Sequence, residues 1–109
     1  MSISSRLKRR YVVIRCTKCE EAESAIAAVA EIIERAFGVV GLSHVDPRLV
    51  DSWGGSLYII SVSREGVDKL LASLVLAKDR PFEVVKITGT LRKARRIASS
   101  LAGDRRISQ

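Results

Sequence analysis

The chain has 109 residues, of which 47% are hydrophobic, and a formal net charge of +7 at pH 7. This length allows one hydrophobic core but hardly a second, and no apolar run approaches the roughly 20 residues of a membrane-spanning helix. We therefore expect one soluble domain over residues 1–109, with a basic lead-in (1–8) and a tail (104–109) as candidates for disorder. Residues 1–8 lack an apolar stretch followed by a small-residue cleavage site, so we expect a cytoplasmic protein.

The positive charge is concentrated at the two ends of the sequence. Residues 6–18 contain six Lys and Arg residues and no acid, and residues 86–106 contain seven and a single Asp. Residues 19–85 carry six bases and eleven acids. If the two ends meet in the fold, they form one positive surface that suits a polyanion such as a nucleic acid. The alternative is solvated charge on exposed helix faces and in a tail.

The first predicted strand covers residues 10–16 (RYVVIRC), which are rich in β-forming side chains. A helix is expected next, because Thr17 and Glu20 resemble a capping box and apolar residues then recur at helical spacing between positions 26 and 37. Gly38 is the predicted C-terminal stop of this helix.

Residues 43–51 (SHVDPRLVD) are expected to form an edge strand, because Pro47 cannot donate a hydrogen bond to a neighbouring strand. A predicted turn at residues 52–55 (SWGG) leads to a buried strand at residues 56–62 (SLYIISV). Ser63 is the predicted cap of a second helix, which ends near Ala77. Residues 82–88 (FEVVKIT) form the fourth predicted strand.

The last predicted helix is strongly amphipathic. Thr90 is its expected N-terminal cap and Gly103 its expected end. One face of this helix carries apolar residues, namely Leu91, Ala94, Ala98 and Leu101. The rest of its surface carries four cations, namely Arg92, Lys93, Arg95 and Arg96.

The predicted order β-α-β-β-α-β with an extra C-terminal helix is that of a ferredoxin-like split β-α-β sandwich, an α+β fold. In this topology the first and third strands are central. The apolar character of both strands agrees with that position, and the proline-bearing strand falls at an edge.

Cys16 and Cys19 form a C-x-x-C pair between a strand and a helix, which is the position of a thioredoxin-type redox pair. No second cysteine pair or nearby histidine completes a zinc site. Redox chemistry, a structural disulfide and a chance spacing are the three interpretations of this pair. The single histidine, His44, has no recognisable nucleophile or ligand partner, so neither a catalytic residue nor a metal site is expected.

Three aromatic residues are candidates for contacts with a partner. Tyr11 and Tyr58 on the two central strands invite comparison with sheets that stack RNA bases. Residues 55–62 lack the basic, glycine-spaced aromatic signature of those sheets, so we do not expect such a platform. Trp53, in the predicted turn, is either a lid over the core or an exposed anchor for a partner protein.

Several short motifs, taken in order, resemble ribonuclease P protein component 2, a family shared by archaea and eukaryotes. The resemblance spans residues 9–101. Its most specific part lies at the start of the last helix, where the family has a Gly-Thr-hydrophobic-basic signature. The matching motifs are Arg10-Tyr11, Phe37-Gly38 with Gly41-Leu42, Ser63-Arg64-Glu65, and Gly89-Thr90-Leu91-Arg92-Lys93-Ala94.

The resemblance implies an archaeal subunit of ribonuclease P with no catalytic residues of its own. In such an enzyme the RNA performs the magnesium-dependent cleavage of precursor tRNA that generates mature 5′ ends. The resemblance implies that the protein itself binds no cofactor and that Mg²⁺ acts through the RNA. The implied partners are the ribonuclease P RNA, precursor tRNA indirectly, and the barrel-like protein component 3, in a dimer of heterodimers.

The two basic segments and the start of the last helix define the residues expected to contact RNA. Cationic side chains neutralise phosphates, and a helix N-terminus offers backbone N–H groups to them. The main candidates are Arg9, Arg10, Thr90, Arg92, Lys93, Arg95 and Arg96. The weaker candidates are Arg6, Lys8 and Lys86.

Two other functions fit the same predicted fold. A generic RNA-binding module of the ribosomal type would use the same basic ends on a different RNA. A regulatory domain that binds a small molecule predicts homodimers and ligand-dependent stability instead of salt-dependent RNA affinity. The fold alone does not separate these functions, because the ferredoxin-like scaffold supports many.

Overall fold

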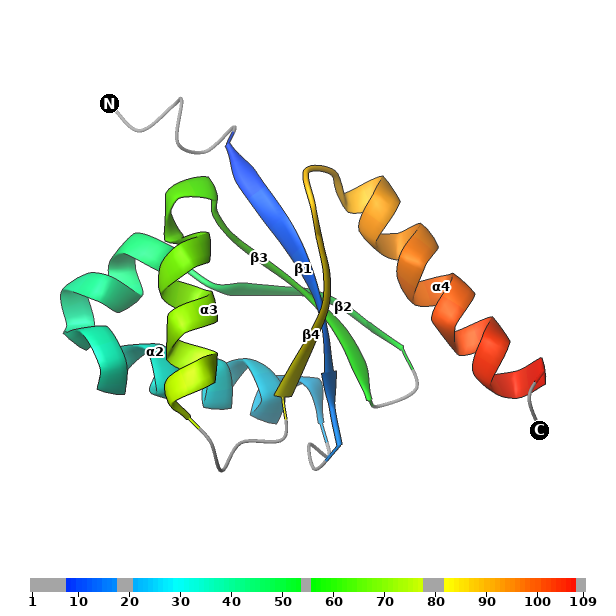
Figure 1. Cartoon of the computed structure of the whole chain (residues 1–109), viewed down its shortest axis with the longest axis horizontal. Coiled ribbons are helices and arrows are strands. Elements are labelled where there is room, and N and C mark those ends of the chain that lie inside the picture. The colour runs from blue at the N-terminus through cyan, green and yellow to red at the C-terminus, as the bar shows by residue number, and fades with distance from the viewer. Residues whose placement is uncertain (1–7, 18–20, 54–55, 78–81, 108–109) are drawn as a thin grey trace.

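The computed structural model describes residues 8–17, 21–53, 56–77 and 82–107. A four-stranded antiparallel sheet, with strand order β2-β3-β1-β4, lies between α2 and α3 on one face and α4 on the other (Figure 1). The elements in chain order are β1 (Arg9–Cys16), α2 (Ala22–Val45), β2 (Arg48–Trp53), β3 (Leu57–Ser63), the 3-10 helix η1 (Arg64–Gly66), α3 (Val67–Leu76), β4 (Phe82–Thr88) and α4 (Leu91–Ile107). This confirms the predicted ferredoxin-like α+β fold.

The central strands are β1 and β3, as predicted, because both have apolar side chains on both faces. Val12, Val13 and Ile14 in β1 are 0% exposed, and every residue from 57 to 62 in β3 is buried. A strand with two apolar faces must be covered on both sides. In this fold α4 supplies the second cover.

The sheet separates two hydrophobic clusters. On one face Val12, Ile14 and Tyr58 pack with residues of α2 and α3 such as Ile33 and Leu70. On the other face lies the cluster formed by Val13, Leu57, Ile59, Ala94 and Ala98, with residues of β2 and α4 around it. Because successive side chains of β1 point to opposite faces of the sheet, alternate residues of this strand pack against α2 and α3 or against α4.

The connection between α2 and β2 differs from the prediction. Gly38 adopts φ +76°, a conformation that glycine tolerates, but the chain resumes a helical path after this kink and α2 continues to Val45. The helix ends at Asp46, which has φ +50° and donates its backbone N–H to the Leu42 carbonyl (2.9 Å). The expected edge strand at 43–51 was therefore wrong at its start, because His44 is helical and the strand begins at Arg48.

Other element ends also shift. Trp53 belongs to β2 and not to a turn, while Gly54 and Gly55 lie outside the described residues. The expected capping box at Thr17 is not used, because α2 begins at Ala22 and Glu21 occupies the cap position. At the other end, α4 continues past Gly103 to Ile107, so the glycine does not terminate the helix.

Ser63 was predicted to cap the second helix, but it caps the 3-10 helix η1, which leads into α3, whereas Gly66 occupies the cap position of α3 itself. The Ser63 hydroxyl accepts a hydrogen bond from the Gly66 backbone N–H (2.9 Å) and donates one to the His44 carbonyl (2.7 Å). A Cβ on Gly66 would lie only 2.6 Å from the Val45 Cα, so a larger residue would push η1 away from α2. The short side chain of Ser63 and the absent one of Gly66 therefore let α3 dock beside the end of α2.

Candidate nucleic-acid interface

Helix α4 is amphipathic in the way the sequence predicts. Its inner side, with Ala94 and Ala98 fully buried and Leu91 and Leu101 half-buried, packs on the sheet. The outer side presents the cations to solvent, since these four residues are all exposed: Arg92, Lys93, Arg95 and Arg96. One helix therefore closes the core and presents a positive surface.

The N-terminus of α4 is capped by Thr90. The Thr90 Oγ1 accepts a hydrogen bond from the Lys93 backbone N–H (3.2 Å), as predicted, and the Thr90 carbonyl accepts one from the Ala94 N–H (3.2 Å). The Thr88 hydroxyl donates to the Thr90 carbonyl (2.8 Å) and so stabilises the turn into the helix. Thr90 is exposed, and the remaining N–H groups of the first turn are available to an anion.

The two basic ends of the sequence meet at this turn. Tyr11 in β1 is the register partner of Thr88 in β4, so the start of β1 runs beside the β4–α4 connection (Figure 1). A Cβ built on Gly89 would lie 3.6 Å from Nη1 of Arg10, which places the Arg10 guanidinium beside the start of α4. Lys8 is exposed just before β1, and Arg6 lies outside the described residues.

One further cation, Lys86, lies on the α4 side of the sheet, and Arg95 of α4 contacts an acid there. Lys86 is the register partner of Val13, whose side chain belongs to the α4-side cluster, so exposed Lys86 shares that face. Arg95 Nε lies 3.3 Å from the Asp51 carboxylate in β2, and its side chain is 53% exposed. Within the described residues, no acid forms an ion pair with Arg92, Lys93 or Arg96.

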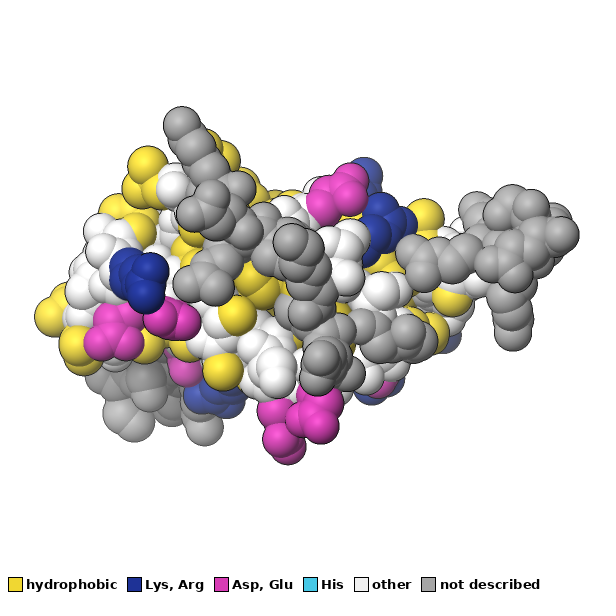
Figure 2. Space-filling view, turned by 90° about the horizontal axis from the view of Figure 1, so that it is seen from below, with side chains coloured by type: hydrophobic (Ala, Val, Ile, Leu, Met, Phe, Trp, Pro, Cys, Tyr) yellow, Lys and Arg dark blue, Asp and Glu magenta, His cyan; other side chains and the backbone are white. Residues whose placement is uncertain are grey.

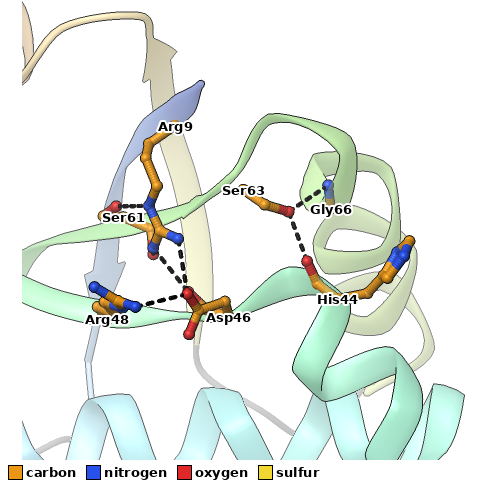
Figure 3. Close-up of polar contacts among 7 residues, drawn as sticks. All are labelled: Arg9, His44, Asp46, Arg48, Ser61, Ser63 and Gly66. Atoms are coloured by element: carbon orange, nitrogen blue, oxygen red, sulfur yellow. Dashed lines mark hydrogen bonds and ion pairs between the residues drawn. The ribbon is translucent and has the colours of Figure 1, made fainter. Parts of the chain in front are cut away.

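Arg9 joins three parts of the fold, and its side chain is only 14% exposed (Figure 3). Its Nε donates to Ser61 Oγ (2.6 Å) and its Nη1 to the Asp46 carboxylate (2.9 Å). Its Nη2 donates to the backbone carbonyls of Asp46 and Ser61, both at 2.8 Å. These bonds tie β1 to β3 and to the end of α2, so the geometry gives Arg9 a structural role, and its contact with RNA stays a prediction.

The Asp46 carboxylate is shared by two guanidinium groups. Arg48 Nη2 lies 3.0 Å from the same Asp46 oxygen that Arg9 contacts. Burial alone raises the pKa of the Asp46 carboxyl, but the hydrogen bonds and positive charges of Arg48 and Arg9 outweigh burial and hold the pKa below its ordinary value. Sequence reasoning missed this cluster, because its members lie far apart in the chain and no motif joins them.

The aromatic residues do not form a base-stacking platform. Tyr58 is 0% exposed among the residues covered by α2 and α3, whereas Tyr11 packs on the opposite face beside α4. Trp53 is half-buried and packs against the α4-side cluster, which agrees with a lid over the core. Its alternative role as an anchor for a partner stays a prediction.

Cys16 lies at the end of β1, is 1% exposed and is disulfide-bonded. Cys19 lies outside the described residues. A buried, bonded sulfur agrees with the structural interpretation of the C-x-x-C pair better than with a redox site, which must be reached by its substrate.

The exposed apolar side chains lie on the helices of the face opposite α4. In the part of the chain that the structure describes, the large hydrophobic residues with the greatest exposure are Phe37, Val39, Val40, Val75 and Leu76, all in α2 and α3. Figure 2 shows hydrophobic side chains gathered at the end of the molecule where these helices lie.

The described residues contain neither a membrane-spanning helix nor a cluster of metal ligands. None of their helices is long and apolar enough to cross a membrane. Nor do these residues bring together three or more His, Cys, Asp or Glu side chains in a group that could hold a metal ion.

The fold and this surface define a class of protein, namely a small ferredoxin-like domain whose additional helix presents cations beside the start of the first strand. Residues 10–99 match the Rpp14/Pop5 family, a family of ribonuclease P protein subunits. The match covers most of the chain, so the protein belongs to the Rpp14/Pop5 family, which confirms the resemblance that the motifs indicated. No curated protein matches the chain at a significant level.

Proposed function

We propose that this protein binds the catalytic RNA of ribonuclease P and supports it in generating the mature 5′ ends of tRNA. Membership of the Rpp14/Pop5 family makes a role in the ribonuclease P complex the general function. The observation that carries the RNA-binding role is the outer side of α4, where Arg92, Lys93 and Arg96 are exposed and no described acid forms an ion pair with them. Family membership also favours this function over a ribosomal RNA-binding module or a small-molecule sensor.

The proposed mechanism is electrostatic. A folded RNA crowds its phosphates, and cationic side chains that bind them release counterions and lower the repulsion between RNA segments. The N-terminus of α4, capped by Thr90, adds backbone N–H donors for one phosphate. Catalysis belongs to the RNA and its Mg²⁺ ions in this proposal, and the protein lowers the Mg²⁺ concentration at which the RNA folds into its active form.

The proposed RNA-contacting residues follow from their exposure and from their place beside the start of α4. The main set is Thr90, Arg92, Lys93, Arg95 and Arg96, which are exposed, and half-buried Arg10, whose guanidinium lies beside Gly89, with Lys8 and Lys86 at its margin. Arg9 contributes by fixing the start of β1, since its guanidinium is engaged by Ser61 and Asp46. We also propose protein component 3 as the protein partner, in a dimer of heterodimers, on a surface other than the outer side of α4.

The test is precursor-tRNA cleavage at low Mg²⁺ by the cognate ribonuclease P RNA with protein component 3, with and without this protein. The proposal expects cleavage that depends on adding the protein. A control reaction at high Mg²⁺ shows that the RNA is competent. If the RNA is competent and both proteins are folded, yet adding this protein leaves cleavage at low Mg²⁺ unchanged, the proposed function is wrong.

A further inference from the structure

A row of residues with polar groups crosses the α4 face of the sheet at the end nearest the start of α4. Ser61 and Thr88 in this row are buried (6% and 8% exposed), whereas Arg48 at its end is exposed. Directly opposite residues on neighbouring strands share a face. The register pairs Arg48 with Ser61, Ser61 with Tyr11, and Tyr11 with Thr88, so the row runs across all four strands. Tyr11 packs with the α4-side cluster, which identifies the face.

The neighbouring row on the same face is apolar on the two central strands. It contains Ile59 and Val13, which are both 0% exposed and pack under Ala94 and Ala98. In the row from Arg48 to Thr88, Tyr11 packs against the α4-side cluster. The Arg9 guanidinium lies over Ser61, with its Nε 2.6 Å from the Ser61 hydroxyl.

The Arg48 end of this row carries a positioned positive charge. Arg9, Asp46 and Arg48 together have a net charge of +1, because one carboxylate serves two guanidinium groups. Arg9 is 14% exposed and is engaged inside the protein, whereas Arg48 is 69% exposed. The contact with Asp46 at 3.0 Å restricts the Arg48 side chain while its other N–H donors face solvent, so less entropy is lost when an anion binds.

The other end of the row reaches the start of α4. Thr88 donates a hydrogen bond to the Thr90 carbonyl, and Arg92 and Lys93 follow in the first turn of the helix. Neighbouring strands lie about 4.8 Å apart, so Arg48 and Thr88 are separated by roughly 14 Å across the sheet. One nucleic-acid backbone can contact both ends of a row of this length.

We propose that Arg48 is a second phosphate-binding point, and that an RNA backbone runs over this end of the α4 face from the exposed first turn of α4 to exposed Arg48 at the start of β2. The inference rests on the proposed function, because it takes the outer side of α4 as the first point of contact. Asp46 and Arg9 act as positioning residues for Arg48. The partner is an RNA phosphate, which the planar guanidinium can bind through two N–H groups.

The test compares Arg48→Ala with Arg35→Ala in binding of the ribonuclease P RNA by the assembled protein subunits over a range of salt concentrations. Arg35 is a matched control, because its side chain is 71% exposed, contacts one carboxylate (Glu31, 2.9 Å) and lies on α2 on the opposite side of the sheet. Both variants change the net charge equally.

Arg48→Ala should weaken binding and reduce the slope of log affinity against log salt by about 0.7 to 1, the value for one phosphate contact. Arg35→Ala should change neither. Equal losses in both variants, or an unchanged slope in Arg48→Ala, would overturn the inference. A third variant, Arg92→Ala with Lys93→Ala, separates the two proposals: if it lowers the slope while Arg48→Ala does not, only the second phosphate-binding point is wrong.

Discussion

The two faces of the sheet differ in how completely helices cover them. On the α2 and α3 face, the side chains of Val12, Ile14 and Cys16 along β1 are all buried. On the α4 face, the apolar row that contains Val13 and Ile59 is followed by a polar row that contains Ser61. Along β1 the first face is buried from Val12 to Cys16, whereas the second divides its area between a core and a polar row that ends at exposed Arg48. Substitutions on the two faces should therefore affect different measurements.

The largest effect on stability is expected from a truncation on the α2 and α3 face. Ile33 is 0% exposed, so Ile33→Ala should lower the free energy of unfolding by about 2–5 kcal/mol through reduced burial and a cavity. Urea denaturation followed by circular dichroism measures the change. Val39→Ala on the same helix is the control, because Val39 is 68% exposed and its truncation should cost little. Equal losses in the two variants would contradict the assigned core.

Substitutions on the outer side of α4 should affect RNA binding and leave stability nearly unchanged. Replacing Arg92, Lys93, Arg95 and Arg96 together with Ala should leave the unfolding transition nearly unchanged, since Ala favours helices and these side chains are exposed. Affinity for ribonuclease P RNA should fall, and its salt dependence should flatten by about 0.7 to 0.9 log units for each phosphate that is no longer neutralised. An unchanged salt slope would show that the exposed cations of α4 do not bind RNA.

Substitutions of Arg9 and Arg48 test whether the first residue has a structural role and the second is free to bind a ligand. Arg9→Ala should cost about 1–3 kcal/mol of stability, because it removes the donors that satisfy Ser61 and Asp46 in a partly buried position. Arg48→Ala should change stability by less than about 0.5 kcal/mol, since the side chain is 69% exposed. Thermal and urea unfolding of both variants measure this difference. A larger loss in Arg48→Ala than in Arg9→Ala would reverse the roles assigned to the two residues.

The smallest expected effect is the pH dependence that comes from Asp46. Its pKa is lower in the folded protein than in the unfolded chain, where a carboxyl titrates at about 3.9. The ionised Asp46 therefore stabilises the fold above that pH, and the stabilisation is lost as the pH falls through the lower, folded pKa. Unfolding of the wild type and Asp46→Asn should differ most near neutral pH and converge in acid. A difference that grows on acidification would contradict the lowered pKa.

Elements with local signals could be predicted from the amino-acid sequence alone. Alternating or continuous apolar residues predicted the strands, and 3.6-residue periodicity predicted both faces of α4. Ser63 and Thr90 were predicted as caps because a hydroxyl bonds to a backbone N–H only three residues away. The strand order followed from the topology and from which strands are apolar on both faces.

Features that depend on residues distant in the chain could not be predicted and are seen only in the folded structure. Gly38 kinks α2 without ending it, and β2 begins only after Asp46 has closed the helix. Arg9 was predicted as an RNA contact from its place in a basic segment, yet its guanidinium bonds to residues 37 and 52 positions away. The sequence does not show whether a charged side chain forms hydrogen bonds inside the protein or is exposed to solvent. Sheet register and helix docking bring its partners within hydrogen-bonding distance, and these depend on the whole fold.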